Sequence, residues 1–304
     1  MIFSEITENQ SRIIIDTIQL YEAYLNAFHQ SMSYKGGMHW KKSNGKEYLF
    51  KTIDRNGNGK SLGPRNRETE STFTSFHKGK QQAKTQLKSL RFRLDEQARI
   101  CKAVKVNRTP KIVTQILSVL DQNKLSGKGL VVIGTNVMYA YEILASVYLD
   151  AAIMATQDLD LMWDTRTKLT LFTIHQMNNE GLLGLLKQVD KSFEMITPKS
   201  FRAVNKEGYM VDLVQAEPKS IAVNPPGSIG NDNDIHAAPV KNLQWLISSP
   251  KVKQTIIGND GYPANIVVPD PRAFVLHKIW LSSQIDRDAI KKSEILHKGS
   301  QLPN

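Results

Sequence analysis

The sequence predicts an α+β fold in which helices flank a mixed sheet and a largely helical, basic module comes first. Short apolar runs typical of strands lie at residues 130–133, 156–163 and 209–214. Longer amphipathic patterns lie earlier in the chain. The net charge of +11 is uneven, because residues 35–111 hold 20 Lys or Arg and only 6 Asp or Glu. We therefore expect a basic module followed by a sheet-containing domain.

The N-terminal module is predicted to contain two long helices. Residues 4–33 carry apolar side chains at helical spacing, and residues 75–105 form a basic helix with one apolar stripe. Residues 35–70 are rich in turn formers, with one strand expected at Tyr48–Phe50 and a hairpin turn at Asn56–Gly59. The stripe of the second helix is Leu87, Leu90, Leu94, Ala98 and Cys101.

The remaining elements follow from apolar runs and turn signals. Thr109–Pro110 is a typical helix start. The hairpin turn expected at Asn205–Gly208 makes the strand that contains Asp212 antiparallel to the strand before it. The other expected elements are a strand at 130–133, a strand at 156–163, a helix near 178–190, strands at 201–204 and 209–214, a long loop at 217–238 and a helix at 272–283.

Three aspartates lie within these predicted strands. Residues two apart on a strand face the same side, so Asp158 and Asp160 can reach one ligand while Leu159 points into the core. Asp212 lies in an apolar run, where a charge is costly to bury without a partner such as a metal ion. The alternative interpretation makes Asp158 a cap of its strand and Asp212 a solvated edge residue. The pattern favours one acidic site.

A glycine turn precedes the acidic strands. Gly134 follows the strand at 130–133, and a helical pattern begins after Thr135. Glycine lets the backbone approach a phosphate closely, and the helix start offers free N–H groups and a positive dipole end. The Thr135 hydroxyl could add a further donor.

This arrangement resembles the nucleotidyltransferase-fold, polymerase β-like superfamily. Its motif is a Gly-Ser or Gly-Thr turn, then Asp-x-Asp on one strand, then a third Asp on a later strand. The chain also resembles a bacterial family of nucleotidyltransferase-like proteins over roughly residues 45 to 290. The matching segments are Ser61–Arg65, Val132–Asn136, Ala155–Leu161 and Pro269–Leu281.

The resemblance implies a metal-dependent nucleotidyltransferase of EC 2.7.7 type, which moves a nucleoside monophosphate from an NTP to an acceptor and releases pyrophosphate. Asp158 and Asp160 would bind two Mg²⁺ (or Mn²⁺) ions. Asp212 would bind the catalytic ion and help deprotonate the acceptor. Gly134 and Thr135 would hold the β- and γ-phosphates. The acceptor stays open between an RNA end such as that of a tRNA, a protein side chain and a small molecule.

Three basic residues are candidates for nucleotide binding. Lys278, on the last predicted helix, could neutralise the triphosphate, and the resemblance supports that role. Arg65 and Arg67 follow a Gly-Pro turn and could point at phosphates. The alternatives are a surface lysine, solvated arginines, or a pairing of Arg65 with Glu68 or Glu70.

Composition sets the wider frame. At 304 residues the chain suits two domains, expected at 1–125 and 126–290, with a tail at 291–304 that departs from the family pattern. One cysteine excludes an intramolecular disulfide, which fits a reducing cytoplasm. We expect no signal peptide and no membrane span.

Two other functions remain open at this stage. One is a nucleic-acid-binding protein on an inactive nucleotidyltransferase fold, which the basic module and its aromatic residues favour. The other is a non-catalytic scaffold that binds a partner. The oligomeric state, the base of the NTP and the acceptor are not defined by the sequence.

Overall fold

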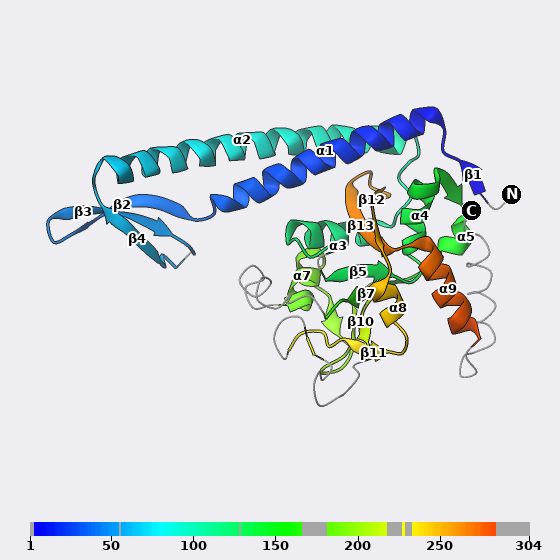
Figure 1. The fold of residues 1–304 in the computed structure, drawn as a ribbon. Helices are drawn as coiled ribbons and strands as arrows, with labels where there is room; N and C mark the ends of the chain where they lie inside the picture. Colours follow the sequence, from blue (N-terminus) through cyan, green and yellow to red (C-terminus); the bar gives the residue numbers. More distant parts are fainter. Residues whose placement is uncertain are drawn as a thin grey trace. The chain divides into compact units, whose positions relative to one another are not determined.

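The computed structural model describes residues 3–54, 56–127, 129–165, 181–217, 227–228 and 233–283. The chain divides into two compact units, one of residues 16–97 and one of residues 1–15 with 98–304. The two long helices each contribute to both units (Figure 1). The predicted domain boundaries after residues 125 and 290 stay predictions.

The unit of residues 16–97 is built on the two predicted helices, which are both confirmed. Helix α1 (Glu8–Ser33) and helix α2 (Arg67–Ala103) lie side by side (Figure 1) and share an apolar cluster. Helix α2 starts earlier than predicted. Asn66 and Thr69 exchange hydrogen bonds between side chain and backbone N–H, both at 2.9 Å, and so satisfy two donors at the helix start. The cluster contains Leu20, Tyr21, Tyr24, Leu25, Ala27, Leu90 and Leu94.

A three-stranded antiparallel sheet completes this unit, in the order β2 (Gly37–Ser43), β3 (Lys46–Thr52), β4 (Gly59–Pro64). The strand predicted at Tyr48–Phe50 is confirmed as the central strand, and the predicted hairpin turn joins β3 to β4. The two outer strands were not predicted. Their residues are mostly Lys, Gly and Ser, so they lack the apolar alternation by which a strand is recognised.

The second unit contains a mixed sheet, which confirms the predicted fold class. Its order is β5-β7-β10-β9-β8, and β11 also pairs with β10. Strand β10 runs parallel to β7 and antiparallel to β9, while β5 runs antiparallel to β7. The bounds are β5 Leu130–Ile133, β7 Asp158–Trp163, β8 Glu194–Met195, β9 Arg202–Val204, β10 Met210–Ala216 and β11 Ala238–Val240.

Helices and a second hairpin pack around this sheet, and the predicted helices near 109, 178–190 and 272–283 are confirmed as α3, α7 and α9. Pro110 is the N-cap of α3 and not its first helical residue. The hairpin β12–β13 was not predicted. The bounds are α3 Lys111–Gln122, α4 Val137–Ala145, α5 Ala151–Met154, α7 Gly181–Val189, α8 Gln244–Ser248, α9 Pro271–Ser282, β12 Lys251–Ile257 and β13 Pro263–Pro269, with a small pair of β1 Phe3–Glu5 and β6 Val147–Leu149.

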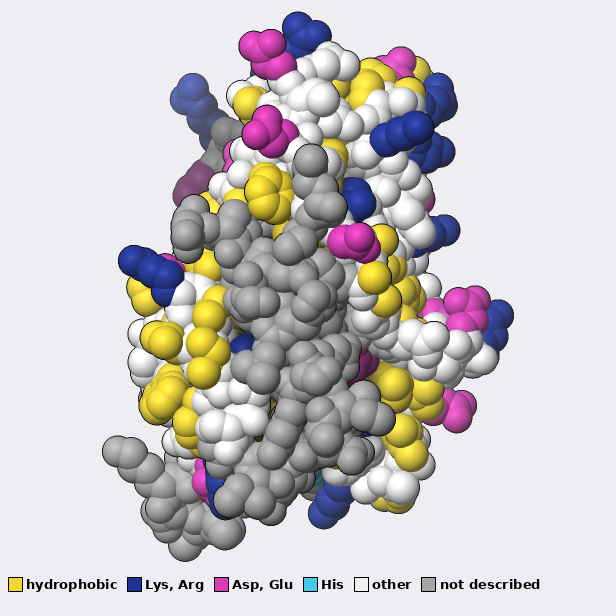
Figure 2. Space-filling view, turned by 90° about the vertical axis from the view of Figure 1, so that its right-hand side faces the viewer, with side chains coloured by type: hydrophobic (Ala, Val, Ile, Leu, Met, Phe, Trp, Pro, Cys, Tyr) yellow, Lys and Arg dark blue, Asp and Glu magenta, His cyan; other side chains and the backbone are white. Residues whose placement is uncertain are grey.

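Helix α9 packs Phe274 and His277 inward and leaves Leu276 and Ile279 exposed. Figure 2 shows hydrophobic side chains at the surface among charges of both signs. Among the described residues, no helix is long and apolar enough to cross a membrane. The expected C-terminal tail at 291–304 and most of the expected loop at 217–238 lie outside the described residues.

Candidate active site

The parallel pairing of β7 with β10 brings the three predicted aspartates to one region of the sheet. Asp160 is the register partner of Asp212, and Asp158 is the partner of Met210. Register partners on adjacent strands face the same side, so Asp158, Asp160 and Asp212 share one face. Leu159 faces the other way and is fully buried in the main core, as expected.

The face that carries the aspartates also carries a smaller apolar cluster beneath α8 and α9. Met162 on β7 and Val214 on β10 belong to this cluster, together with Leu246 and Ile247 of α8 and Ala273 of α9. The carboxylates therefore lie at the end of an apolar face.

The burial and mutual proximity of the carboxylates affect the pKa of Asp160 most clearly. Burial, and then the negative charges of Asp158 and Asp212, raise the pKa of Asp160 from its ordinary value of 3.8 to about 7. The positive charges of Lys278 and Arg202 act in the opposite direction but do not cancel this effect. A carboxylate in this position favours a ligand that adds positive charge.

Asp212 is buried, with 5% of its surface exposed, and it is held by an arginine. Arg202 donates from Nε to Oδ1 and from Nη2 to Oδ2, both at 2.6 Å. This bidentate pair raises the pKa of the Arg202 guanidinium. The alternative of a solvated edge residue does not hold for Asp212, because β10 lies between β7 and β9.

Arg202 was not among the predicted site residues, although the sequence contains a signal for it. The predicted turn at Asn205–Gly208 joins β9 to β10, and the residues opposite one another across it can be counted outward. Val204 pairs with Met210, which places Arg202 opposite Asp212.

The glycine turn lies directly against the acidic strand. Gly134 has φ +73°, in the left-handed region, and a Cβ atom there would lie 1.9 Å from Oδ2 of Asp160. Only glycine fits this position without a shift of Asp160. Thr135 follows as predicted, and its carbonyl accepts a 3.1 Å hydrogen bond from the backbone N–H of Met138 at the start of α4.

Asn136 is a second residue of this region that was not predicted as a site residue. It is buried, and its Nδ2 donates a 2.7 Å hydrogen bond to the backbone oxygen of Asp158. The side chain of Asp158 in turn accepts a hydrogen bond from the Thr156 hydroxyl. These contacts tie the glycine turn to the first residue of β7.

Lys278 lies within electrostatic reach of the acidic residues, since its charge lowers the pKa of Asp160. Its Nζ lies 5.2 Å from the centroid of the Phe274 ring, one turn earlier on α9. The structure therefore brings Lys278 to the same region as the three aspartates and Gly134.

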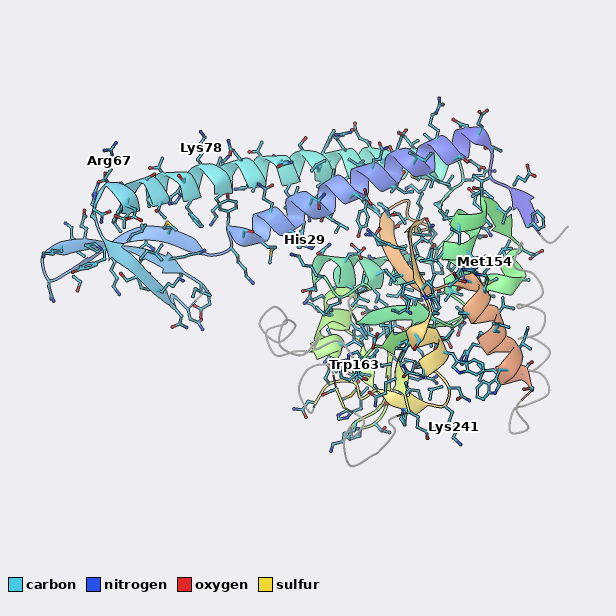
Figure 3. The ribbon with its side chains drawn as sticks, in the orientation of Figure 1. His29, Arg67, Lys78, Met154, Trp163 and Lys241 are labelled. Atoms are coloured by element: carbon cyan, nitrogen blue, oxygen red, sulfur yellow. The ribbon has the colours of Figure 1, made fainter. Side chains whose placement is uncertain are left out.

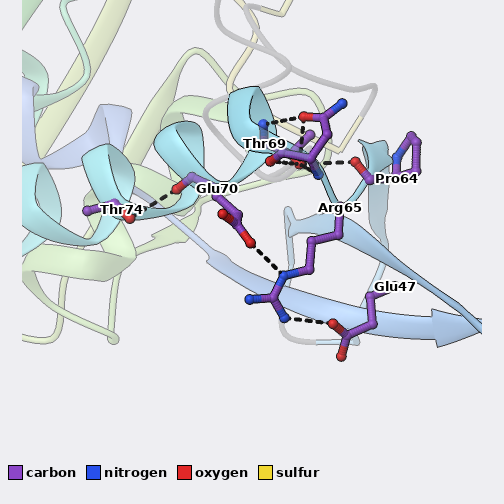
Figure 4. A network of polar contacts seen from close by, with 7 residues as sticks. Glu47, Pro64, Arg65, Thr69, Glu70 and Thr74 are labelled. Carbon is purple, nitrogen blue, oxygen red and sulfur yellow. Dashed lines mark hydrogen bonds and ion pairs between the residues drawn. The ribbon is translucent and has the colours of Figure 1, made fainter.

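Arg65 and Arg67 belong to the other unit. Arg65 binds Glu47 at 2.7 Å and Glu70 at 2.8 Å (Figure 4), and its guanidinium lies 4.9 Å from the centroid of the Trp40 ring. The predicted alternative of a pairing with Glu70 is therefore the observed one. Arg67 is exposed where α2 begins (Figure 3).

The donor set suits Mg²⁺ or Mn²⁺ by its chemistry, since both prefer hard carboxylate oxygens. In the side-chain positions observed, no group of three or more His, Cys, Asp or Glu among the described residues could hold a metal ion. Both oxygens of Asp212 already accept hydrogen bonds from Arg202 in this arrangement.

Comparison with known protein families assigns the chain to a family. Residues 111–297 match the model of a family described as nucleotidyltransferase. The match covers more than half of the chain, and the chain belongs to this nucleotidyltransferase family. It includes all of β5, β7, β10 and α9, and so every predicted site residue except Arg65 and Arg67. No curated protein and no solved structure matches the chain.

Proposed function

We propose that the protein is a metal-dependent nucleotidyltransferase that moves a nucleoside monophosphate from an NTP to an acceptor and releases pyrophosphate. The observation that carries the proposal is that Asp158, Asp160 and Asp212 lie on one face of β7 and β10, with the Gly134 turn directly against Asp160. Family membership supports nucleotidyl transfer in general. Metal dependence, the NTP and the acceptor are parts of the proposal.

The proposed metal ligands are Asp158, Asp160 and Asp212. If bound, Mg²⁺ or Mn²⁺ would supply positive charge to the reacting phosphate and to the leaving pyrophosphate. The three carboxylates would hold these ions from one face of two adjacent strands. Asp212 must exchange part of its pairing with Arg202 for a metal contact.

The proposed reaction is an in-line displacement at the α-phosphorus. The acceptor oxygen forms a bond to this phosphorus while the bond to the bridging oxygen of the leaving pyrophosphate breaks. Asp212 helps to take up the proton of the acceptor. Charge that develops on the phosphates is stabilised by groups held in place before the reaction.

The groups available to hold the triphosphate come from three elements. The backbone at Gly134 and Thr135 leads into the N-terminus of α4, where N–H groups suit the β- and γ-phosphates. Lys278 contributes a positive charge from α9. Arg202, once released from Asp212, offers a planar guanidinium that suits a phosphate oxygen pair.

The acceptor stays open between an RNA end, a protein side chain and a small molecule, and we place the activity in the cytoplasm. An inactive fold that binds nucleic acid is the second candidate, favoured by one observation. Arg202 occupies both oxygens of Asp212, as it would if no metal ever bound there.

The test is NTP binding by the full chain, measured for each of the four NTPs with and without Mg²⁺ or Mn²⁺. We expect binding that requires the metal ion and is lost in Asp158→Ala/Asp160→Ala. Asp16→Asn, which removes an exposed carboxylate on α1, is the control and should bind like the native chain.

Transfer is then sought with α-labelled NTP against cellular RNA and protein. Label that appears in either fraction, and not with the Asp158→Ala/Asp160→Ala variant, identifies the acceptor class. The proposal fails if none of the four NTPs binds in the presence of either ion. Equal binding by the native chain and the double variant would show that NTP binds elsewhere.

A further inference from the structure

The sheet β2–β3–β4 has two faces of different chemistry, and strand register defines them. Leu49 on β3 lies between Trp40 on β2 and Gly63 on β4. The next residue, Phe50, lies between His39 and Ser61. Side chains alternate along a strand, so these two sets point to opposite faces.

One face is the apolar side of the unit. Met38 and Leu49 are buried there with Phe76 of α2, and Trp40 and Phe73 pack against them. This accounts for three of the aromatic residues in the basic module, Trp40, Phe73 and Phe76. They are structural.

The opposite face carries aromatic residues that do not belong to this cluster. Phe50 and Tyr48 lie two apart on β3 and are partly exposed, and His39 on β2 is exposed. The rings of His39 and Phe50 lie 5.6 Å apart, centroid to centroid, at an angle of 53°. A strip of adjacent rings thus lies on the surface of the sheet.

Positive charge accompanies these rings. Lys41 is the register partner of Tyr48, and its Nζ lies 5.3 Å from the centroid of the Phe50 ring. Lys46 is exposed on the same face at the start of β3. No Asp or Glu lies on this face within the three described strands, because Glu47 points to the other side and binds Arg65.

The surrounding unit is also basic, since residues 16–97 contain 15 Lys or Arg and 8 Asp or Glu. Exposed basic residues also lie along α2, where Lys78 and Arg67 project from the helix (Figure 3). A polyanion is the partner that this charge attracts.

We propose that the face of β2–β3–β4 formed by His39, Lys41, Lys46, Tyr48 and Phe50 binds single-stranded nucleic acid. Bases stack on the rings, and the two lysines contact the adjacent phosphates. Aromatic rings interleaved with cations on a sheet surface are the usual platform for single strands, since every base offers a flat face. An acidic peptide would use the lysines but leave the row of rings without a function.

The position of Lys41 fits this use. A lysine over an exposed ring gains only a small cation–π energy, so the flexible side chain can leave the ring when a base stacks there. Its ammonium group then remains close to the phosphate of the stacked nucleotide. The proposal concerns the unit of residues 16–97 alone and holds whether or not the acidic site transfers nucleotides.

The experiment measures fluorescence anisotropy of labelled oligouridylate and oligothymidylate of about 12 nucleotides. It uses the full chain with EDTA and without NTP, so that failure of the transferase cannot affect the result. Phe50→Leu removes the ring but keeps apolar volume, and we expect it to lose at least about 5-fold in affinity. Phe50→Tyr keeps the ring and should bind like the native chain.

Phe92→Leu is the matched control, since Phe92 is an exposed ring on α2, away from the sheet strands. It should not change the affinity. For Lys41→Gln/Lys46→Gln, we expect the slope of log affinity against log salt concentration to become shallower by about 1.4, as for two lost phosphate contacts. Circular dichroism of each variant confirms that the sheet and helices are retained.

Tighter binding of either single strand than of a duplex of the same length supports the proposal, and the comparison of uridylate with thymidylate shows whether the sugar is recognised. Any one of three results overturns the proposal: no binding at low salt, tighter binding of the duplex than of the single strands, or equal affinity of Phe50→Leu and the native chain.

Discussion

The raised pKa of Asp160 predicts a stability that depends on pH, and Asp160→Asn is the variant that tests it. In the folded chain the pKa of Asp160 is about 7, against an ordinary value of 3.8. The folded state therefore binds the proton more tightly than the unfolded state between these two values. Unfolding free energy should fall as the pH rises from about 4 to about 7 and then level off.

The size of the effect follows from the shift. A displacement of about 3 pH units corresponds to at most about 4 kcal/mol at pH 8, and partial solvent screening of the site reduces this to about 2 kcal/mol. Asp160→Asn removes the charge with almost no change of shape. At pH 8 this variant should be more stable than the native chain by about 2 kcal/mol, or about 3 °C in Tm for a chain of 304 residues.

The assay is thermal unfolding followed by circular dichroism from pH 5 to pH 8, with EDTA to remove divalent ions. As the pH rises, the Tm of the native chain should decrease relative to the Tm of Asp160→Asn. Asp16→Asn removes an exposed carboxylate of α1, and its Tm should depend on pH in the same way as that of the native chain. Parallel curves for the native chain and Asp160→Asn would refute the electrostatic account of the site.

Three further substitutions test other contacts. Gly134→Ala should lower the Tm by more than Gly208→Ala. Both glycines have positive φ, but of the two only Gly134 would place a Cβ against a neighbouring carboxylate, that of Asp160. Equal decreases in Tm would contradict the close approach of Gly134 to Asp160. Arg202→Gln should lower the free energy of unfolding, measured with urea in the absence of metal ions, by about 1.5–3 kcal/mol. Mn²⁺ should raise the Tm of this variant more than the Tm of the native chain. An equal increase in both would show that Arg202 and the ion do not compete for Asp212. Arg108→Met should lower the free energy of unfolding by about 3–5 kcal/mol at pH 8, since it leaves the buried carboxylate of Glu142 with the Leu149 N–H but without a positive charge beside it. A loss that does not shrink at pH 5 would argue against this cause.

The acidic strands could be predicted from sequence because their pattern is local. Asp158 and Asp160 alternate with apolar residues, and the hairpin turn before Asp212 fixes the direction of β10. The structure confirms these strands and the antiparallel pairing of β9 with β10. It also places Asp212 opposite Asp160, which depends on the parallel pairing of strands about fifty residues apart.

The elements that were missed lack such a local signal. Strands β2 and β4 carry Lys, Gly and Ser, and they are strands because β3 supplies the pairing between them. The same pairing separates Leu49 and Trp40 on the apolar face from Phe50 on the other. Composition alone does not distinguish the aromatic residues of this module, and only the register assigns Trp40 to the core and Phe50 to the surface.

The acidic site also shows how its negative charges are offset by residues from other elements. Three carboxylates on one partly buried face are unfavourable, and the folded chain offsets them with Arg202 from β9 and Lys278 from α9. These cations come from elements separated in sequence from Asp158 and Asp160. A cation bound at 100 times its dissociation constant would add about 2.7 kcal/mol of stability. This is similar to the cost of charging Asp160, so ligand binding and stability should be coupled most strongly above pH 7.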